Sequence, residues 1–290
     1  MSEVRSHCPE QNQTLTQYLD SMSLEELRNL TKHWLVDDKH KVVGCLHFKV
    51  GTSTLDVIFC NNSVPVPYKP NTHMYWEKWK KCLPQNGVYY LGDSDRYTKQ
   101  EIIVRINTYY KFMVVRHPLD RLFSMWKDKM ADWNVWYRHY LGAPILAAYR
   151  KHLPESIIKE GKGVLFEELV QYVLDGHKDV HWKGPYNDQC IPCLVDYDAI
   201  IKLETFAHDI IPFINDKLEG RSLDIKENSH SGTSWDANYH KYIPGYAKVT
   251  EKQVSGLVEK YALDLSQFGY QYEFKNGRMN ISCTSSQGCC

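Results

Sequence analysis

A short apolar run near the N-terminus is followed by residues of the kind that bind phosphate. KVVGCLHF (41–48) predicts a buried strand, and small polar residues follow it before a helical pattern begins. In such a turn the glycine lets a ligand approach the backbone, the next amides point at an anion, and the lysine adds positive charge. The candidate phosphate ligands are Lys49, Val50, Gly51, Thr52, Ser53 and Thr54. The turn lacks the Walker A pattern, and an ordinary capped helix is the alternative interpretation.

A second pair of polar residues follows a second predicted strand. KFMVVR (111–116) ends on Arg116, and Ser124 comes eight residues later in a predicted helix that starts near Pro118. An arginine fork and a hydroxyl can share one phosphate group. Between 111 and 151 there are eight Lys or Arg and three Asp or Glu, which is a local basic excess. A solvated basic helix face is the alternative.

The elements that must position these residues alternate between strands and helices. A third strand is predicted at 197–204, and further helices at 164–175, 205–218 and 250–262. This alternation indicates an α/β fold with a mostly parallel sheet. The expected parts of the chain are a helical polar lead-in over 1–40 with an apolar face that includes Trp34, a main domain over 41–274, an irregular stretch over 64–97, and a frayed polar tail over 275–290.

Composition excludes some classes of protein. Lys plus Arg and Asp plus Glu are both 35 in 290 residues, so the formal net charge is zero. Binding of nucleic acid through an overall positive charge is therefore not expected. No apolar run reaches the ~20 residues of a membrane helix. Nine cysteines are too few for a disulfide scaffold. The Asn-x-Ser/Thr sequons, which become glycosylation acceptors only in a secretory compartment, are at Asn12, Asn29, Asn61 and Asn280.

Taken together, the two phosphate-binding turns resemble those of sulfotransferases that use 3′-phosphoadenosine 5′-phosphosulfate (PAPS). FKVGTST (48–54) is similar to their 5′-phosphosulfate loop, and RHPLDRLFS (116–124) to their 3′-phosphate segment. DVHWKGPYNDQCIPCLVDYDAIIKLETF (179–206) closely resembles a signature of Golgi carbohydrate sulfotransferases that act on chondroitin and dermatan. KYALDLSQFGY (260–270) is similar to the closing segment of that family. Without the resemblance, the C-x-x-C within 179–206 could be half of a zinc site or a redox pair.

The resemblance implies a P-loop-like sulfotransferase fold, with a central mostly parallel sheet flanked by helices, and PAPS as co-substrate without a metal. It implies a glycan acceptor, anionic or containing galactosamine, and a Golgi location. Lys49 would stabilise the leaving group, and His181 is our first choice for the general base. The rival bases are His47, His117 and Glu168, and the basic excess could hold an anionic glycan. Trp133, Trp136 and Tyr137 could stack on sugar rings or form a buried helix face.

Some residues depart from the family pattern. Phe48 stands where the family usually has proline, and Leu55 where it has an aromatic residue. The alternatives are therefore a sulfotransferase for small-molecule alcohols and a non-catalytic relative that binds nucleotide or glycan. The family's membrane anchor is not among these residues, so a cytoplasmic location is the alternative to the Golgi. The terminal pair Cys289-Cys290 is a weak prenylation signal.

Overall fold

The computed structural model forms two compact units, and each is described by itself. It describes residue 8 and residues 12–60, 81–93, 96–130, 134–182, 186–221 and 238–284. The first unit comprises Met1–Arg116, Tyr186–Tyr239 and Thr284–Cys290, and the second comprises His117–Pro185 and His240–Cys283. Asn61, Trp133, Cys289 and Cys290, which carried predictions, lie outside the described residues.

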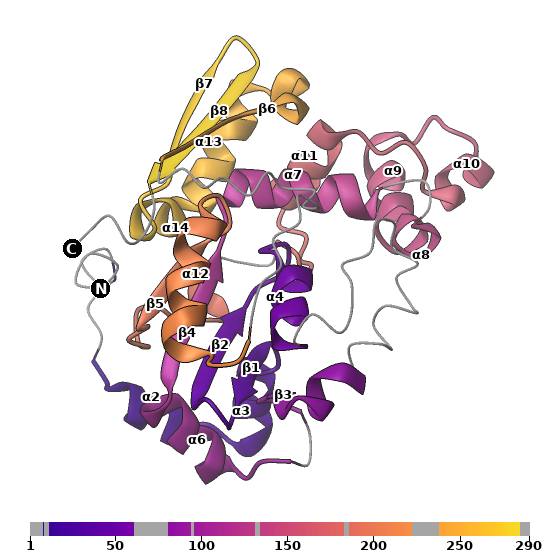
Figure 1. The fold of residues 1–290 in the computed structure, drawn as a ribbon. Coiled ribbons are helices and arrows are strands. Elements are labelled where there is room, and N and C mark those ends of the chain that lie inside the picture. Colours follow the sequence, from indigo (N-terminus) through magenta and orange to yellow (C-terminus); the bar gives the residue numbers. More distant parts are fainter. Residues whose placement is uncertain are drawn as a thin grey trace. The chain divides into compact units, whose positions relative to one another are not determined.

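The first unit is built on a five-stranded sheet in the order β3-β1-β2-β4-β5 (Figure 1). The strands are β1 (Trp34–Asp37), β2 (Val42–Leu46), β3 (Val88–Tyr90), β4 (Tyr110–Val115) and β5 (Ala199–Lys202). β2, β4 and β5 pair in parallel, while β1 pairs antiparallel with both β2 and β3. Four strands therefore run in one direction and β1 in the other, which confirms the predicted α/β fold with a mostly parallel sheet.

Aromatic rings fill one face of this sheet. Phe112 of β4 lies directly opposite Gly44 of β2, and a side chain at Gly44 would collide with the Phe112 ring. The same ring contacts Phe59 of α4 (Thr52–Phe59) and Phe213 of α12 (Phe206–Lys217), with centroids 6.1 and 4.7 Å apart. Both helices therefore cover one face of the sheet, and α12 lies beside β5 (Figure 1).

Two disulfides hold the segment around Cys190 and Cys193 in the same unit. Cys45 follows Gly44 in β2, so its side chain leaves the opposite face of the sheet, where it bonds to Cys190. Cys193 bonds to Cys8. Trp34 of β1 lies opposite Cys45 and donates from its indole nitrogen to the carbonyl of Gln189 at 3.1 Å. The C-x-x-C segment thus covers a sheet face, and its cysteines bond to distant partners and not to each other.

The lead-in differs from the sequence prediction at Trp34. Helices α2 (Leu15–Ser21) and α3 (Leu24–Leu30) begin with capping boxes from Thr14 and Ser23. α3 ends at Leu30, and Trp34, which was expected on the same helical face, begins β1. The prediction was wrong here because an apolar residue at helical spacing fits equally well at the start of a buried strand.

The second unit contains helices and a three-stranded sheet in the order β6-β8-β7. Its elements are α7 (Pro118–Lys129), α8 (Val135–Tyr137), the π-helical turn η1 (Arg138–Gly142), α9 (Ala143–Tyr149), α10 (Glu155–Glu160), α11 (Phe166–Leu174), β6 (Asn238–Ile243), η3 (Pro244–Lys248), α13 (Glu251–Lys260), α14 (Ala262–Gln267), β7 (Gln271–Lys275) and β8 (Arg278–Thr284). Phe123 and Phe166 pack edge to face with centroids 5.3 Å apart, and Phe166 also contacts Tyr246. These rings join α7, α11 and η3 into one core.

Two stretches expected to be irregular contain strands. β8 (Arg278–Thr284) is a strand and pairs with β7 over Arg278–Ser282, so residues 278–284 are not a frayed tail. Asn276 and Gly277 turn this hairpin with φ values of 52° and 71°, as a two-residue hairpin loop requires. β3 lies within 64–97 and forms one edge of the larger sheet. Within the described residues, no helix is both long enough and apolar enough to cross a bilayer.

Candidate active site

The loop after β2 has the backbone of an anion-binding turn. Lys49 and Gly51 have φ values of 66° and 87°, in the left-handed region that few residues other than glycine adopt. A side chain at Gly51 would also meet Leu203, whose Cδ1 would lie 2.7 Å from the added Cβ. Gly51 is the N-cap of α4 and gives it no side-chain cap. The first amides of α4 therefore have no capping side chain from Gly51, and this N-terminus can receive an anion.

Arg116 reaches this loop from the next parallel strand. It follows β4 directly, and its Nη1 donates to the carbonyl of Lys49 at 3.1 Å. The side chain of Arg116 is buried, at 7% exposure. The hydroxyl of Tyr186 accepts from the Arg116 amide at 2.8 Å and lies 3.2 Å from its carbonyl. Tyr186 is fully buried and was not singled out from the sequence.

The larger sheet explains why these residues meet. β2, β4 and β5 are parallel, so their carboxyl ends lie at one edge. The loop of Lys49–Thr54, Arg116 and Leu203 each follow one of those ends. Ligands of α/β proteins bind at this edge of the sheet, because the loops there are free to vary while the strands stay fixed. Two motifs about 65 residues apart in the sequence are thereby joined.

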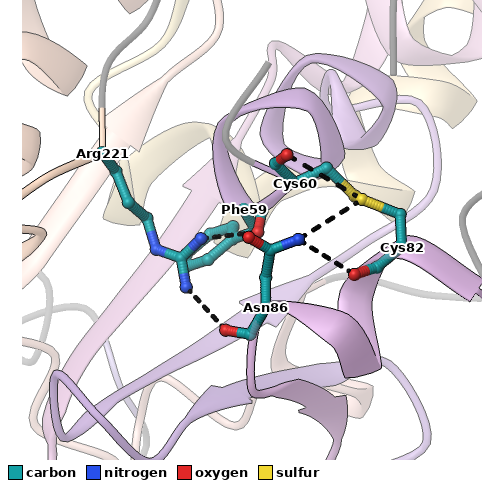
Figure 2. Close-up of a disulfide and its surroundings, with 5 residues drawn as sticks. All are labelled: Phe59, Cys60, Cys82, Asn86 and Arg221. Atoms are coloured by element: carbon teal, nitrogen blue, oxygen red, sulfur yellow. Dashed lines mark hydrogen bonds between the residues drawn. A yellow bond between two sulfur atoms is a disulfide. The ribbon is translucent and has the colours of Figure 1, made fainter. Parts of the chain in front are cut away.

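The far end of α4 is anchored by a disulfide and by hydrogen bonds (Figure 2). Cys60, the C-cap of α4, is bonded to Cys82, and the Asn86 amide donates to the carbonyl of Cys82 at 3.1 Å. Arg221 donates to the carbonyls of Phe59 and Asn86 at 2.6 and 3.2 Å. α4 is therefore held in place at its C-terminus while its N-terminus faces the candidate phosphate loop.

Phe48 and Leu55, the two residues that depart from the family pattern, are both packed against other residues. Leu55 is fully buried in α4. The ring of Phe48 packs edge to face against His33, with centroids 4.7 Å apart. Both residues are thus packed into the first unit.

Ser124 and His181, the other predicted site residues, belong to the second unit. Ser124 is half-buried on α7. The start of α7 is fixed by the Tyr246 hydroxyl, which donates to the Leu119 carbonyl at 3.0 Å. Arg121 on the same helix is buried and lies 3.9 Å from the buried carboxylate of Asp264. Arg121 therefore has a structural ion-pair role within this unit.

A buried carboxylate orients the ring of His181. Nδ1 of His181 lies 2.5 Å from Oδ1 of Asp179, and the amide of His181 donates to the same oxygen at 3.0 Å. Burial opposes ionisation of Asp179, but the hydrogen bonds from His181 outweigh it and lower the pKa of Asp179. Nδ1 is thus assigned the proton, and Nε2 points to the Tyr137 hydroxyl at 3.4 Å. Nε2 is the nitrogen left to accept a proton.

The rival bases have other hydrogen bonds. His117 is the N-cap of α7, where Nδ1 accepts from the Leu119 amide at 3.3 Å and Nε2 lies 3.0 Å from the Gln271 carbonyl. Both ring nitrogens of His117 are therefore used. Glu168 is bound by Arg150 through two hydrogen bonds of 2.5 and 2.9 Å and also accepts from the Leu165 amide. His47 is buried, with its ring against that of Tyr186.

Much of the basic excess over 111–151 pairs with carboxylates inside its own unit. The pairs are Lys111 with Asp198, Arg121 with Asp264, Lys129 with Asp128, and Arg150 with Glu168. Asp198, Asp264 and Glu168 lie outside 111–151, so they neutralise bases that the count along the sequence leaves unpaired. The excess available to a glycan is therefore smaller than the sequence predicts.

Asp56 of α4 is a buried acid that the sequence reasoning missed. It is 1% exposed, and its Oδ1 has no hydrogen-bond partner among the described residues. Burial raises the pKa of Asp56 to about 8. The signal that could have found it is an aspartate in the middle of the apolar run Leu55–Phe59. Within the part of the chain that the structure describes, no group of three His, Cys, Asp or Glu side chains is placed to hold a metal ion.

Comparison with known proteins agrees with the fold and the motifs. The model of the Sulfotransferase family matches residues 32–271, which is most of the chain. The chain therefore belongs to the sulfotransferase family, and its mixed α/β structure is consistent with the sulfotransferase fold. No solved structure matches the chain.

Among curated proteins, the chain is similar to several carbohydrate sulfotransferases. It is 30% identical to human carbohydrate sulfotransferase 8 over 251 residues, or 82% of this chain and 55% of that protein. It is 30% identical to human carbohydrate sulfotransferase 9, over 82% of this chain and 53% of that protein. The chain is 27% identical to carbohydrate sulfotransferase 14 of Danio rerio, over 92% of this chain and 69% of that protein. The chain spans about half the length of the first two relatives.

Proposed function

We propose that this chain transfers the sulfuryl group of PAPS to a hydroxyl of a carbohydrate, with a chondroitin- or dermatan-like glycan as the acceptor. The observation that carries the donor half of the proposal is the hydrogen bond between Arg116 and the carbonyl of Lys49. It joins the two phosphate-binding motifs at one sheet edge, as a ligand with two separated phosphates requires. The acceptor half is supported by the family and by the chain's similarity to carbohydrate sulfotransferases 8 and 9.

The donor's groups are assigned to the two turns. The amides and hydroxyls of Thr52, Ser53 and Thr54 bind the 5′-phosphosulfate at the start of α4, beside Lys49. Arg116 and Ser124 bind the 3′-phosphate, as the family resemblance implies. The buried position of Arg116 strengthens its interaction with a phosphate, because a charge-assisted hydrogen bond is stronger in surroundings of low dielectric constant.

The reaction is an in-line displacement at sulfur. A bond forms between the acceptor oxygen and sulfur, and the bond between sulfur and the 5′-phosphate oxygen breaks with its electron pair. Lys49 stabilises the negative charge that builds on that departing oxygen. Nε2 of His181 takes the proton of the acceptor hydroxyl, and Asp179 stabilises the imidazolium that results.

We also propose that the protein works in the lumen of the Golgi. The described residues of the first unit include three disulfides, and such bonds persist in oxidising compartments. Asn12, Asn29 and Asn280 are exposed and begin glycosylation sequons. Protein expressed through a secretory pathway should therefore lose mass on treatment with a glycosidase that removes N-linked glycans, and unchanged mobility would argue against this location.

Thermal unfolding with 3′,5′-adenosine bisphosphate tests the donor site. At about 100 times its dissociation constant this product should stabilise the protein by about 2.7 kcal/mol, whereas ATP at the same concentration should not. Lys49→Ala should abolish most of the shift. Lys41→Ala is the matched control, because Lys41 also has a positive φ, of 51°, but lies exposed at the other end of β2.

Each outcome has a distinct meaning. A shift with the bisphosphate alone, followed by transfer of labelled sulfate from PAPS to desulfated chondroitin, supports the proposal. Transfer to a phenol or a small alcohol but to no glycan would make the acceptor assignment wrong. A shift without any transfer would indicate a nucleotide-binding relative that is not an enzyme, and no shift for a folded sample would contradict the donor site itself.

A further inference from the structure

The second unit carries a pair of stacked aromatic rings on its surface. Trp136 of α8 is 62% exposed and Tyr140 of η1 is 51% exposed. Their ring centroids are 4.7 Å apart and the rings are inclined by only 21°. Large aromatic side chains usually bury most of their area, so an exposed and ordered pair indicates a surface that meets a ligand.

The local backbone holds this pair in place. The Asn134 side chain caps α8 by accepting from the amide of Tyr137 at 3.4 Å. A π-helical turn follows over Arg138–Gly142, and such turns are rare and occur frequently at functional sites. The turn is packed tightly, because a side chain on Gly142 would collide with the carbonyl of Gly161. The two rings therefore project from a rigid element and not from a loose loop.

Ring contacts connect the pair to the proposed base. His181 packs edge to face on Tyr137 with centroids 5.4 Å apart, and Tyr137 packs in the same way on Trp136 at 4.7 Å. Tyr137 thus lies between His181 and the exposed pair. A single sugar whose hydroxyl reaches His181 cannot also cover Trp136 and Tyr140, because the ring of Tyr137 separates them.

We propose that Trp136 and Tyr140 form a platform that stacks on a sugar ring of the acceptor other than the ring that receives the sulfate. The inference rests on the proposed carbohydrate acceptor and adds a second binding position to it. The C–H face of a pyranose is attracted to the negative face of an aromatic ring. Stacking of the two also removes apolar ring surface from water.

The test compares a desulfated chondroitin hexasaccharide with a single N-acetylgalactosamine glycoside as acceptors. Wild-type protein should show the lower KM for the hexasaccharide. Trp136→Ala and Tyr140→Ala should each raise that KM about two- to tenfold, since one aromatic contact contributes about 0.5–1.5 kcal/mol. The KM for the monosaccharide, the KM for PAPS and kcat should stay unchanged. Trp136→Phe should keep most of the advantage of the hexasaccharide.

Tyr272→Ala is the matched control, because Tyr272 is also an exposed ring of the second unit, on β7 at 42% exposure. It should leave every constant unchanged. Thermal unfolding shows whether each variant is folded. An unchanged hexasaccharide KM in both platform variants would overturn the inference, and so would equal changes for both acceptors.

Two further outcomes separate this inference from the proposed function. If wild-type protein transfers sulfate to neither acceptor, the proposed function fails, and calorimetric binding of the hexasaccharide to wild type and Trp136→Ala then decides the platform alone. Weaker binding by the variant supports the platform, and equal binding overturns it. Loss of self-association in sedimentation, with glycan binding unchanged, would make the surface a protein contact and also overturn the inference.

Discussion

The proposed base depends on one carboxylate more than on any other group. Asp179 accepts hydrogen bonds from the amide and from Nδ1 of His181, so it fixes the orientation of the ring and its tautomer together. His181 is only 2% exposed, and rotation of its ring would take the Nδ1 donor away from the buried carboxylate of Asp179, leaving it only the amide. The sequence suggested the histidine through its place in a signature, while the partner is visible only in the structure.

Replacement of His181 and Asp179 should affect turnover and not donor binding. His181→Ala should lower kcat by about 100-fold or more, the usual contribution of a general base. Asp179→Asn should lower it less and move the acid limb of the pH–rate profile to lower pH, because the imidazolium loses a negative neighbour. The measurements are kcat against pH and bisphosphate affinity.

His240→Ala is the control for this pair, because His240 is exposed on β6 in the same unit. It should have wild-type kcat at every pH. Wild-type turnover in His181→Ala would remove His181 as the base and direct attention to His47.

Asp56 should make the stability of the protein fall as pH rises. The pKa of this carboxyl is about 8 in the folded protein, while the unfolded chain ionises it near the ordinary aspartate pKa of 3.8. The native state therefore binds the extra proton between these values, and the free energy of unfolding decreases by at most about 1.4 kcal/mol per pH unit from this group. Asp56→Asn should flatten that dependence in urea unfolding measured from about pH 5 to about pH 8.

The control for Asp56 is Asp93→Asn, since Asp93 lies near Tyr90 but is exposed. It should retain the wild-type slope. The same slope in Asp56→Asn as in wild type would show that the carboxyl is ionised in the folded state.

At the scale of elements, the helices differ in how they begin. α2, α3, α6 (Lys99–Thr108) and α13 all have capping boxes, which satisfy their first amides within the chain. α4 begins at Gly51 without a side-chain cap and carries the candidate phosphate loop. α10 and α12 also begin without a side-chain cap, so the missing cap alone does not mark a site; at α4 it coincides with the loop where the proposed ligand supplies hydrogen-bond acceptors.

Gly51→Ala should both destabilise the protein and weaken bisphosphate binding. The left-handed φ of Gly51 costs a non-glycine residue roughly 1 kcal/mol, and contact of the new Cβ with Leu203 adds to that cost. Gly87→Ala is the matched control, because Gly87 has a φ of 72° with nothing within 4 Å of an added Cβ. Urea unfolding and bisphosphate titration should show a smaller loss of stability and normal binding in Gly87→Ala. Equal effects of the two substitutions would contradict this account of the loop.

At the scale of the whole chain, disulfides fix segments that are far apart in sequence. Cys45–Cys190 and Cys8–Cys193 span 145 and 185 residues, whereas Cys60–Cys82 spans 22. The two long-range bonds hold the C-x-x-C segment in the first unit, where Tyr186 bonds to the Arg116 backbone. Folding of the first unit is thereby coupled to the position of Arg116.

Removal of the longer-range disulfide should cost more stability. In the chain-entropy account, the double variant of Cys45 and Cys190 to Ala should lose about 0.5 kcal/mol more than the same change at Cys60 and Cys82. With Cys8–Cys193 intact, Cys45–Cys190 closes a loop of about 40 residues, against 22 for Cys60–Cys82. Chemical denaturation of the two variants without reductant measures the difference. A larger loss at Cys60 and Cys82 would show that local packing, and not loop closure, dominates.

The sequence by itself determined the fold class and the motifs, because these are local properties. Apolar runs of strand length predicted β2 and β4, and the glycine with three hydroxyl residues marked the phosphate loop. Pro118 marked the start of α7. The Asn276-Gly277 hairpin signal was present and could have predicted β7 and β8.

Tertiary structure alone decided what depends on residues distant in the chain. It brought Arg116 to Lys49, paired the cysteines of C-x-x-C with Cys45 and Cys8, and placed Trp34 in a strand. It also paired Lys111, Arg121 and Arg150 with acids that lie outside 111–151. Burial, charge pairing and disulfide partners are set by three-dimensional proximity, and spacing along one sequence does not contain that information.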